Sequence, residues 1–170
     1  MDQNQYLKDK FLTALDDNRH KLLRLCSVYA EDDDDKKDLF QEATVNIWEA
    51  MPSFNGNSEI NTWMFRITLN VCLRLQSKQS RKKSQFVRMD SIIIDHDVTE
   101  ESNPEQQEQL ANLRKSIKKL NEADRAIIAL YLEELPYKEI AEITGLKENT
   151  VAVKVKRIKK KLLDCLTKRS

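Results

Sequence analysis

Glycine and proline are scarce in this chain: 170 residues include two glycines and three prolines. Sheets usually need more of both for the turns between strands, so the scarcity favours helices joined by short polar links. Apolar residues make up 40% of the chain, which is enough for compact cores, but they form no run long enough to span a membrane. The sequence therefore predicts an all-α protein with no membrane insertion.

The cysteines and the N-terminal segment indicate a cytoplasmic protein. Cys26, Cys72 and Cys165 are odd in number, far apart and without a CxxC pair, so neither a disulfide framework nor a zinc site is expected. We expect Cys26 and Cys72 to be small core residues, because a free cysteine buries readily. The N-terminal segment has early acidic residues and lacks the apolar stretch of a signal peptide.

Charge is arranged in blocks, although the chain as a whole carries a net charge of only +1. Residues 1–59 carry a net charge of −6 and residues 90–109 one of −7, whereas residues 60–89 and 147–170 carry +7 each. Because neutralisation of phosphates drives affinity for nucleic acids, the two basic blocks predict two contacts with a polyanion. Two solvated helix faces would give the same pattern, so charge alone leaves both interpretations open.

Periodic apolar residues predict a first helical domain over residues 1–88. Helical spacing recurs over about residues 4–30, 36–51 and 60–79. Between the first two segments, the run from Glu31 to Asp35 breaks the pattern. Because its charges repel one another, we expect an exposed loop that leads into the next helix, where acidic residues also suit the helix N-terminus.

Residues 89–109 interrupt the helical pattern and predict a flexible acidic linker. The segment is acidic and rich in glutamine, and its few aliphatic residues cannot bury much surface. For residues 105–109, a helix that begins earlier remains an alternative. The second helical domain is expected over residues 110–170.

Local signals organise the beginning of this second domain. Asn121 is a candidate N-cap for a helix, and Pro136 is expected to open another, shorter helix. A preceding helix is indicated by four apolar residues that share one helical face: Leu110, Leu113, Ile117 and Leu120.

The strongest motif is a helix-turn-helix within residues 136–162. Ile140 and Ile143 are predicted to face the core, and Gly145 stands where the chain must turn sharply, which is easiest without a Cβ. A helix with an apolar back and a basic front suits the major groove of DNA, although a plain helical hairpin with a solvated basic face would share these features. The apolar stripe of the second helix comprises Val151, Val155, Ile158 and Leu162.

The exposed side of this second helix supplies candidate contacts with DNA. Arg157 is suited to bidentate hydrogen bonds with guanine, whereas the lysines are suited to phosphates, which set position rather than sequence. Apolar side chains there can contact thymine methyl groups. The candidates are Thr150, Ala152, Val153, Lys154, Lys156, Arg157 and Lys160.

Three sequence motifs in the first domain bear on which helix-turn-helix protein this is. They are the segment Asp38-Leu39-Phe40-Gln41-Glu42, the aromatic residues Trp48 and Phe54, and the run Thr-Trp-Met-Phe-Arg-Ile-Thr-Leu-Asn at residues 62–70. In this order they resemble region two of the extracytoplasmic-function sigma factors of bacteria, and the helix-turn-helix resembles region four. The resemblance covers almost the whole chain. It implies a protein that binds core RNA polymerase and directs promoter recognition, DNA opening and transcription initiation.

The resemblance implies roles for residues of the first domain. The family docks its Asp-Leu-x-Gln-Glu segment on the largest subunit of the polymerase, and the matching residues are Asp38, Leu39, Gln41 and Glu42, although spacing places Leu39 in the core. The family opens and reads the downstream promoter element with the loop before the Thr-Trp segment and the helix after it. Unpaired bases stack on aromatic side chains, and a flipped base needs a pocket with polar atoms. The matching residues are Asn55, Asn57, Asn61, Trp63, Arg66 and Asn70.

The resemblance also implies partners and has limits. Family members are commonly held inactive by an anti-sigma factor, so such a partner is expected beside core RNA polymerase and promoter DNA. No cofactor, metal ion or catalytic residue is implied. Two departures leave the upstream promoter sequence open: Lys147 replaces a serine that caps the recognition helix in many relatives, and Ala152 and Val153 stand where many relatives have basic or small polar residues. For Trp63, spacing alone favours a core position.

Two other functions are compatible with parts of the sequence. A helix-turn-helix regulator that does not act as a polymerase subunit explains residues 110–170 equally well but leaves the motifs of the first domain unexplained. A nuclease that uses carboxylates and a metal ion would have to use the acids from Asp32 to Asp35. Adjacent acids without turn glycines do not resemble an ordered calcium loop, and His20 and His96 have no motif partners, so an enzyme is not expected.

Overall fold

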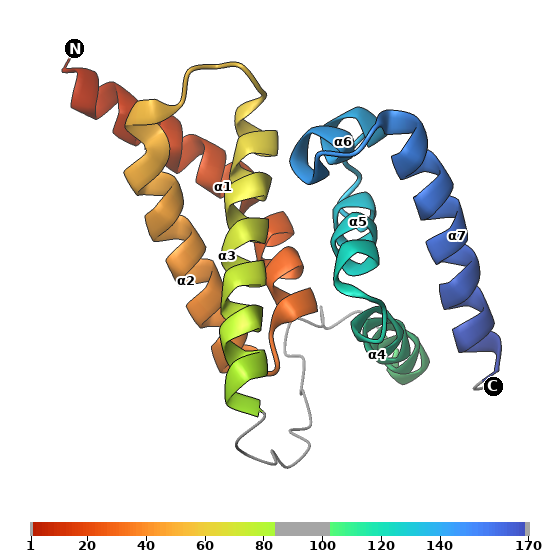
Figure 1. Ribbon diagram of the computed structural model, residues 1–170. Helices are drawn as coiled ribbons and strands as arrows, with labels where there is room; N and C mark the ends of the chain where they lie inside the picture. Colours follow the sequence, from red (N-terminus) through yellow and green to blue (C-terminus); the bar gives the residue numbers. More distant parts are fainter. Residues whose placement is uncertain (1, 84–102, 169–170) are drawn as a thin grey trace. The chain divides into compact units, whose positions relative to one another are not determined.

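The computed structural model describes residues 2–83 and 103–168, and within these ranges every regular element is a helix (Figure 1). The chain divides into two compact units, residues 1–94 and 95–170. The predicted linker, residues 89–109, lies outside the described residues as far as residue 102. From Pro104 onward the chain is helical, so for residues 105–109 the helical alternative is the correct one.

In the first unit, the residues that the structure describes form three long helices that all pack against one another, with one short turn between the second and the third. They are α1 (Gln3–Tyr29), α2 (Asp33–Ala50), the 3-10 turn η1 (Met51–Ser53) and α3 (Ile60–Lys83). Leu22, Ile47 and Met64, one from each helix, are almost completely buried. Each helix is amphipathic and needs the other two to cover its apolar face, because helical stability in proteins comes mostly from such packing.

Cys26 and Cys72 are both buried in this core, which confirms the prediction that they are small core residues. The pKa of the Cys72 thiol is raised well above its ordinary value, first by a hydrogen bond with the Cys26 side chain and then by burial. A buried thiol of this kind stays protonated and unreactive. Both cysteines are therefore packing residues of the first unit.

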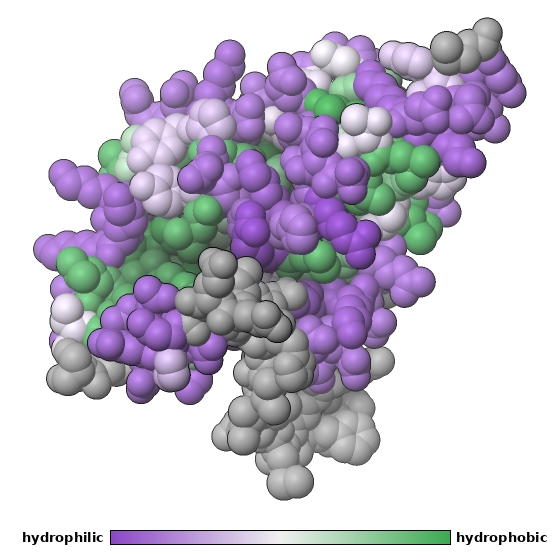
Figure 2. Space-filling model, turned by 180° about the vertical axis from the view of Figure 1, so that it is seen from behind, coloured by the Kyte–Doolittle hydropathy of each residue, from purple (hydrophilic) through white to green (hydrophobic). Residues whose placement is uncertain are grey.

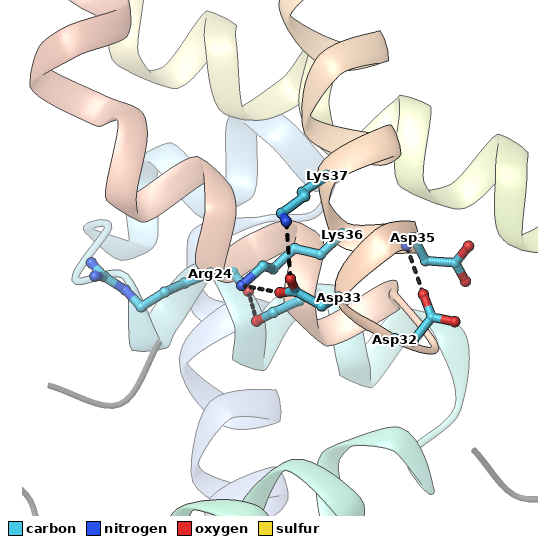
Figure 3. A network of polar contacts seen from close by, with 7 residues as sticks. Arg24, Asp32, Asp33, Asp35, Lys36 and Lys37 are labelled. Carbon is cyan, nitrogen blue, oxygen red and sulfur yellow. Dashed lines mark hydrogen bonds and ion pairs between the residues drawn. The ribbon is translucent and has the colours of Figure 1, made fainter. Parts of the chain in front are cut away.

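The last three residues of the acidic run Glu31–Asp35 form the first turn of α2. The prediction of an exposed loop is therefore wrong for these three residues. Asp32 is the N-cap, and its carboxylate accepts a hydrogen bond from the backbone N–H of Asp35 at 2.7 Å. Asp33 forms ion pairs with Lys36 and Lys37, each at 3.3 Å (Figure 3). The hydrogen bonds from Lys36 and Lys37 lower the pKa of Asp33. Capping, the helix dipole and these lysines thus outweigh the mutual repulsion of the acids.

The described residues of the second unit form four helices: α4 (Pro104–Lys118), α5 (Glu122–Leu132), α6 (Tyr137–Thr144) and α7 (Glu148–Thr167). The predicted cap is confirmed, because the side chain of Asn121 accepts the backbone N–H of Asp124 at 2.8 Å. Ile117 is buried, but Leu110 is 46% exposed. The shared helical face of α4 therefore reaches the core only toward its C-terminal end.

A few large apolar side chains remain exposed outside the two cores. Figure 2 shows one face of the molecule, where hydrophilic residues predominate and hydrophobic residues gather in smaller areas. Exposed apolar residues include Val45 and Trp48 on α2 and Val153 on α7. Helix α2 also carries the predicted polymerase contacts and α7 the predicted DNA contacts. The exposed apolar side chains therefore lie on the helices that are predicted to form interfaces.

Candidate nucleic-acid interface

The helix-turn-helix is formed by α6, the turn at Gly145 and α7. Gly145 ends α6 in the left-handed conformation, with φ 76° and ψ 11°, and its N–H donates to the carbonyl of Ala141 at 2.9 Å. Ile140 and Val151, one on each side of the turn, are both completely buried. The predicted turn is confirmed, and it fixes the direction in which α7 leaves α6.

Substitution of Gly145 tests how much the turn depends on backbone conformation alone. A Cβ added at this position meets no heavy atom within 4 Å, so any loss must come from φ rather than from a clash. We expect Gly145→Ala to destabilise the second unit by about 1–2 kcal/mol, because L-residues pay roughly that amount in the left-handed region. Gly145→Asn should cost less, since Asn tolerates this conformation. Thermal unfolding of both variants provides the comparison, and equal losses would contradict this explanation.

Helix α7 has a buried and an exposed side, as its sequence predicts. Val151, Val155 and Ile158 are at most 1% exposed, and Leu162 is also buried. The predicted DNA contacts divide into two groups: the exposed residues are Val153, Lys156, Arg157 and Lys160, and the half-buried ones are Thr150, Ala152 and Lys154. Lys147 stands at the N-cap without a side-chain cap hydrogen bond, which leaves the first backbone N–H groups of α7 available to a phosphate.

Two other lysines of α7 are engaged within the second unit. Lys159 Nζ lies 3.3 Å from the hydroxyl oxygen of Tyr131 and 5.3 Å from the centre of its ring, and Tyr131 stacks with Tyr137. Lys161 Nζ lies 3.6 Å from a carboxylate oxygen of Asp124. Neither Lys159 nor Lys161 is among the predicted DNA contacts, and each has a partner within its own unit.

The predicted polymerase-binding residues lie along α2. Asp38 and Gln41 are exposed, Glu42 is half-buried, and Leu39 faces the core with 6% of its surface exposed. The placement of Leu39 in the core agrees with its spacing. Asp38, Gln41 and Glu42 therefore form one polar surface, the α2 patch, on the outside of the helix.

Two contacts from other helices border the α2 patch. Arg74 of α3 donates to the Glu42 carboxylate at 2.9 Å, and sequence analysis did not identify it. Trp48 is 39% exposed, and its ring lies 5.2 Å from that of Phe11 of α1. Val45, 49% exposed, lies between Gln41 and Trp48 on the helix, so the polar patch continues into an apolar area that is suited to burial in an interface.

The predicted downstream-element residues lie in the loop before α3 and on α3 itself. Asn55 and Asn57 are exposed, and the Asn55 side chain accepts the backbone N–H of Asn57 at 3.1 Å. Trp63 is half-buried, with its ring 4.9 Å from that of Phe54, so it contributes to packing and keeps an accessible part. Arg66 is also half-buried, and Asn70 is exposed. Because Trp63, Arg66 and Asn70 follow one another at three and four residues, they share one side of α3.

Asn61 lies in the first turn of α3 beside the N-terminal half of α1. It is exposed, and its carbonyl oxygen accepts a hydrogen bond from Asn18 of α1 at 2.8 Å. Together with Tyr6, Lys10 and Ile60, it lines a cavity of about 420 Å³ between the two helices. The only sequence signal for Asn18 is a polar residue within the apolar stripe of α1, which is easily taken for a helix irregularity.

The described residues hold no group of three or more His, Cys, Asp or Glu side chains arranged to bind a metal ion. In the same residues, no helix combines the length and the apolar character that crossing a membrane requires.

Comparison with known proteins places both units in one family. Residues 15–82 match the model of sigma-70 region 2, and residues 110–162 match that of sigma-70 region 4. The chain is 30% identical to the ECF RNA polymerase sigma-E factor of Escherichia coli over 148 residues, which cover 82% of this chain and 77% of the relative. It belongs to the extracytoplasmic-function (ECF) sigma factors.

Other relatives extend this sigma factor's similarity over its whole length. The sigma factor SigV of Bacillus subtilis is 25% identical over 171 residues, which cover 99% of this chain and 98% of SigV. The fold is shared with RpoE of Bartonella quintana, solved with the anti-sigma factor NepR, at a TM-score of 0.74 and 24% identity, with 94% of this chain and 96% of RpoE covered. CnrH, solved with the cytosolic domain of CnrY, has the same fold at a TM-score of 0.72 and 21% identity. The match covers 96% of this chain and 91% of CnrH.

Membership in the family decides between the functions considered from the sequence. Sigma factors associate with RNA polymerase and recognise promoters, and they are initiation factors rather than enzymes. A regulator that acts without the polymerase would account for the match to region 4 but not for the match to region 2. The chain is therefore a polymerase-associated promoter-recognition factor.

Proposed function

We propose that this sigma factor divides the work of initiation between its two units. Residues 1–88 bind core RNA polymerase and open the downstream promoter element, the second unit from Pro104 onward binds the upstream element, and the residues between them connect the two. The observation that supports this division most is the presence, in one chain, of an exposed polar patch on α2 and a basic, exposed side of α7 on separate units. The protein acts in the cytoplasm and supplies no catalytic group, because the polymerase carries out the chemistry.

The α2 patch is the proposed docking surface for the polymerase. Asp38, Gln41 and Glu42 offer two carboxylates and an amide within about one helical turn, which suits a basic and hydrogen-bonding partner surface. Leu39, buried in the core, supports the helix rather than touching the partner. Val45 and Trp48 add an exposed apolar area beside the patch.

The downstream element is assigned to the loop before α3 and to one side of α3. Asn55, Asn57 and Asn61 offer amide donors and acceptors for base edges, and the accessible part of Trp63 offers a ring for stacking. Arg66 and Asn70 extend this surface along α3 toward the phosphates of the same strand. The upstream element is assigned to α7, with Arg157 toward bases and the lysines toward phosphates. The α7 residues are Thr150, Ala152, Val153, Lys154, Lys156, Arg157 and Lys160.

An anti-sigma factor is the proposed regulatory partner. The support is that the structural neighbour from Bartonella quintana was solved with the anti-sigma factor NepR. A partner that covers the α2 patch would compete directly with core polymerase. Capture of the full-length protein by a candidate anti-sigma factor, with simultaneous loss of polymerase binding, tests this competition.

Reconstitution with purified core polymerase tests the proposed function as a whole. The protein should bind the core stably, and the holoenzyme should make transcripts with defined start sites on genomic DNA, whereas core enzyme alone should not. A protein that binds duplex DNA but neither associates with the core nor directs specific initiation would refute the proposal. Sequencing of the transcripts also identifies both promoter elements.

A further inference from the structure

Asn18 is a buried polar residue that uses its amide group to hold a proposed DNA contact. It lies on α1 and is 3% exposed. Its Nδ2 donates to the backbone carbonyl of Ala14 at 2.8 Å and to the Oδ1 of Asn61 at 2.8 Å. A primary amide has two N–H donors, so both of them are used inside the first unit.

These two hydrogen bonds fix which end of the Asn61 amide faces outward. A backbone carbonyl only accepts hydrogen bonds, so the atom of Asn18 that faces Ala14 must be its nitrogen. The same nitrogen faces Asn61, and therefore the Asn61 atom that meets it must be an oxygen. The NH₂ group of Asn61, with two donors, is thus directed away from Asn18. The opposite orientation of the Asn61 amide would bring two NH₂ groups together at a buried site, which is costly.

The surroundings of Asn61 can receive a base. The cavity beside it has a volume of about 420 Å³, is wide open to solvent, and is lined also by two aspartates of α1. Tyr6, 54% exposed, contributes an aromatic ring to its lining, and Lys10 lies 5.9 Å from the centre of that ring. Lys10 also lies 5.1 Å from the ring of Phe54, which packs on Trp63. The cavity therefore adjoins the surface assigned to the downstream element.

We propose that Asn18 is a positioning residue for promoter specificity: it holds Asn61 so that the NH₂ group of Asn61 is directed toward an unpaired base of the downstream element. This inference rests on the proposed role of Asn61 in DNA contact. The expected preference is for a base with a carbonyl at the contacted position, thymine or guanine, over one with an amino group there, adenine or cytosine. The preference belongs to one promoter position, because Asn61 is a single short side chain.

Base preferences of holoenzymes with substitutions at the two asparagines test the proposal. Transcripts are sequenced from a promoter library that is randomised across the downstream element. Asn61→Ala should reduce the preference at one position by about fivefold, the value of one net hydrogen bond. Asn18→Ala frees the Asn61 amide to turn and should reduce the preference at that same position. The double variant should match Asn61→Ala alone, because Asn18 acts through Asn61.

A second substitution reverses the group that is offered to the base. Asn61→Asp keeps an oxygen for the Asn18 hydrogen bond and replaces the outward NH₂ by a second oxygen. It should shift the preference at that position from carbonyl-bearing to amino-bearing bases, again by about fivefold. This variant needs no change in the buried site, so it decides the question even if Asn18→Ala fails to fold. An unchanged preference would overturn the proposed orientation.

Thr68→Ala provides the matched control for the loss of a buried polar group. Thr68 is completely buried and donates to the carbonyl of Met64 at 2.9 Å, as Asn18 does to Ala14, but it is not part of the proposed interface. It should leave base preferences unchanged at a similar cost in thermal stability. If Asn61→Ala changes the preference and Asn18→Ala does not, the inference on Asn18 is wrong and the role of Asn61 stands. If neither substitution changes the base preference while initiation remains specific, Asn61 does not read the base. In that case the inference is wrong, but the proposed function as a sigma factor stands.

Discussion

Glu42→Arg is expected to weaken the binding of this sigma factor to core RNA polymerase by about thirtyfold or more. The reason is that loss of one partner from a charge pair that is buried on binding costs roughly 2 kcal/mol or more, and a reversed charge adds repulsion. Glu42 is half-buried on the exposed side of α2, next to Asp38 and Gln41. A direct binding titration of the full-length protein against labelled core enzyme measures the effect, at fixed salt because the contact is electrostatic.

The ion pair between Glu42 and Arg74 offers a way to separate docking from internal structure. The pair is exposed, with 42% of the Glu42 side chain and 53% of the Arg74 side chain accessible, so it is worth at most about 1 kcal/mol to stability. The double variant Glu42→Arg, Arg74→Glu restores the pair with its charges exchanged. If Glu42 meets the polymerase, the exchanged pair should bind as poorly as Glu42→Arg alone. Recovered binding would mean that Glu42 acts only through Arg74.

A charge reversal elsewhere in the first unit controls for long-range electrostatics. Asp16 is exposed on α1 and is not one of the proposed contacts. Asp16→Arg changes the net charge by the same amount as Glu42→Arg, but it should leave core binding within about twofold, because exposed charges beyond a Debye length are screened. An equal loss in both variants would indicate a general charge effect and not a docking surface.

Features that depend on a few neighbouring residues were predictable from the sequence. The turn at Gly145 and the cap at Asn121 need only the local backbone and one side chain, and both are confirmed. The buried stripe of α7 follows from the 3.6-residue period of a helix. The same rule placed Leu39 in the core, where the structure has it.

Features that depend on contacts distant in sequence could not be predicted. The pair Asn18–Asn61 joins residues of α1 and α3, and Arg74–Glu42 joins α3 and α2. No periodicity relates such residues, because their proximity results from how the helices pack. Leu110 shares a helical face with Ile117 by its spacing, but helix α4 covers the core only near Ile117, so Leu110 is exposed. Spacing identifies a helical face and not how much of that face meets a neighbour.

The candidate site shows the same division. Family motifs predicted candidate contact residues on α2, on α3 and in the loop between them, but they did not predict the partners that orient these residues. Basic residues of α7 could be counted from the sequence, whereas the engagement of Lys159 by Tyr131 depends on how α5 packs on α7. Lys159, which is not among the predicted DNA contacts, therefore has a partner within its own unit.

Simultaneous replacement of Lys156, Arg157 and Lys160 by Gln should weaken upstream-element binding by about a hundredfold at physiological salt. The three residues are exposed on α7, and each one that neutralises a phosphate releases a counterion, so it contributes about 0.9 to the slope of log affinity against log salt. The magnitude of the slope should therefore fall by about 2.7. Holoenzyme binding to a duplex fragment that carries only the upstream element, measured across a range of salt concentrations, gives both values.

A charge-matched control decides whether this effect belongs to α7 or to net charge. Lys115, Lys119 and Lys168 are exposed in the same unit but outside the helix-turn-helix, and their replacement by Gln removes the same three charges. The control variant should keep a slope close to that of the wild type, because counterions are released only where side chains meet phosphates. Equal slopes for the two triple variants would mean that α7 is not the upstream contact. A lower affinity without a lower slope in the α7 variant would instead indicate lost base readout or a displaced helix, because neither of these releases counterions.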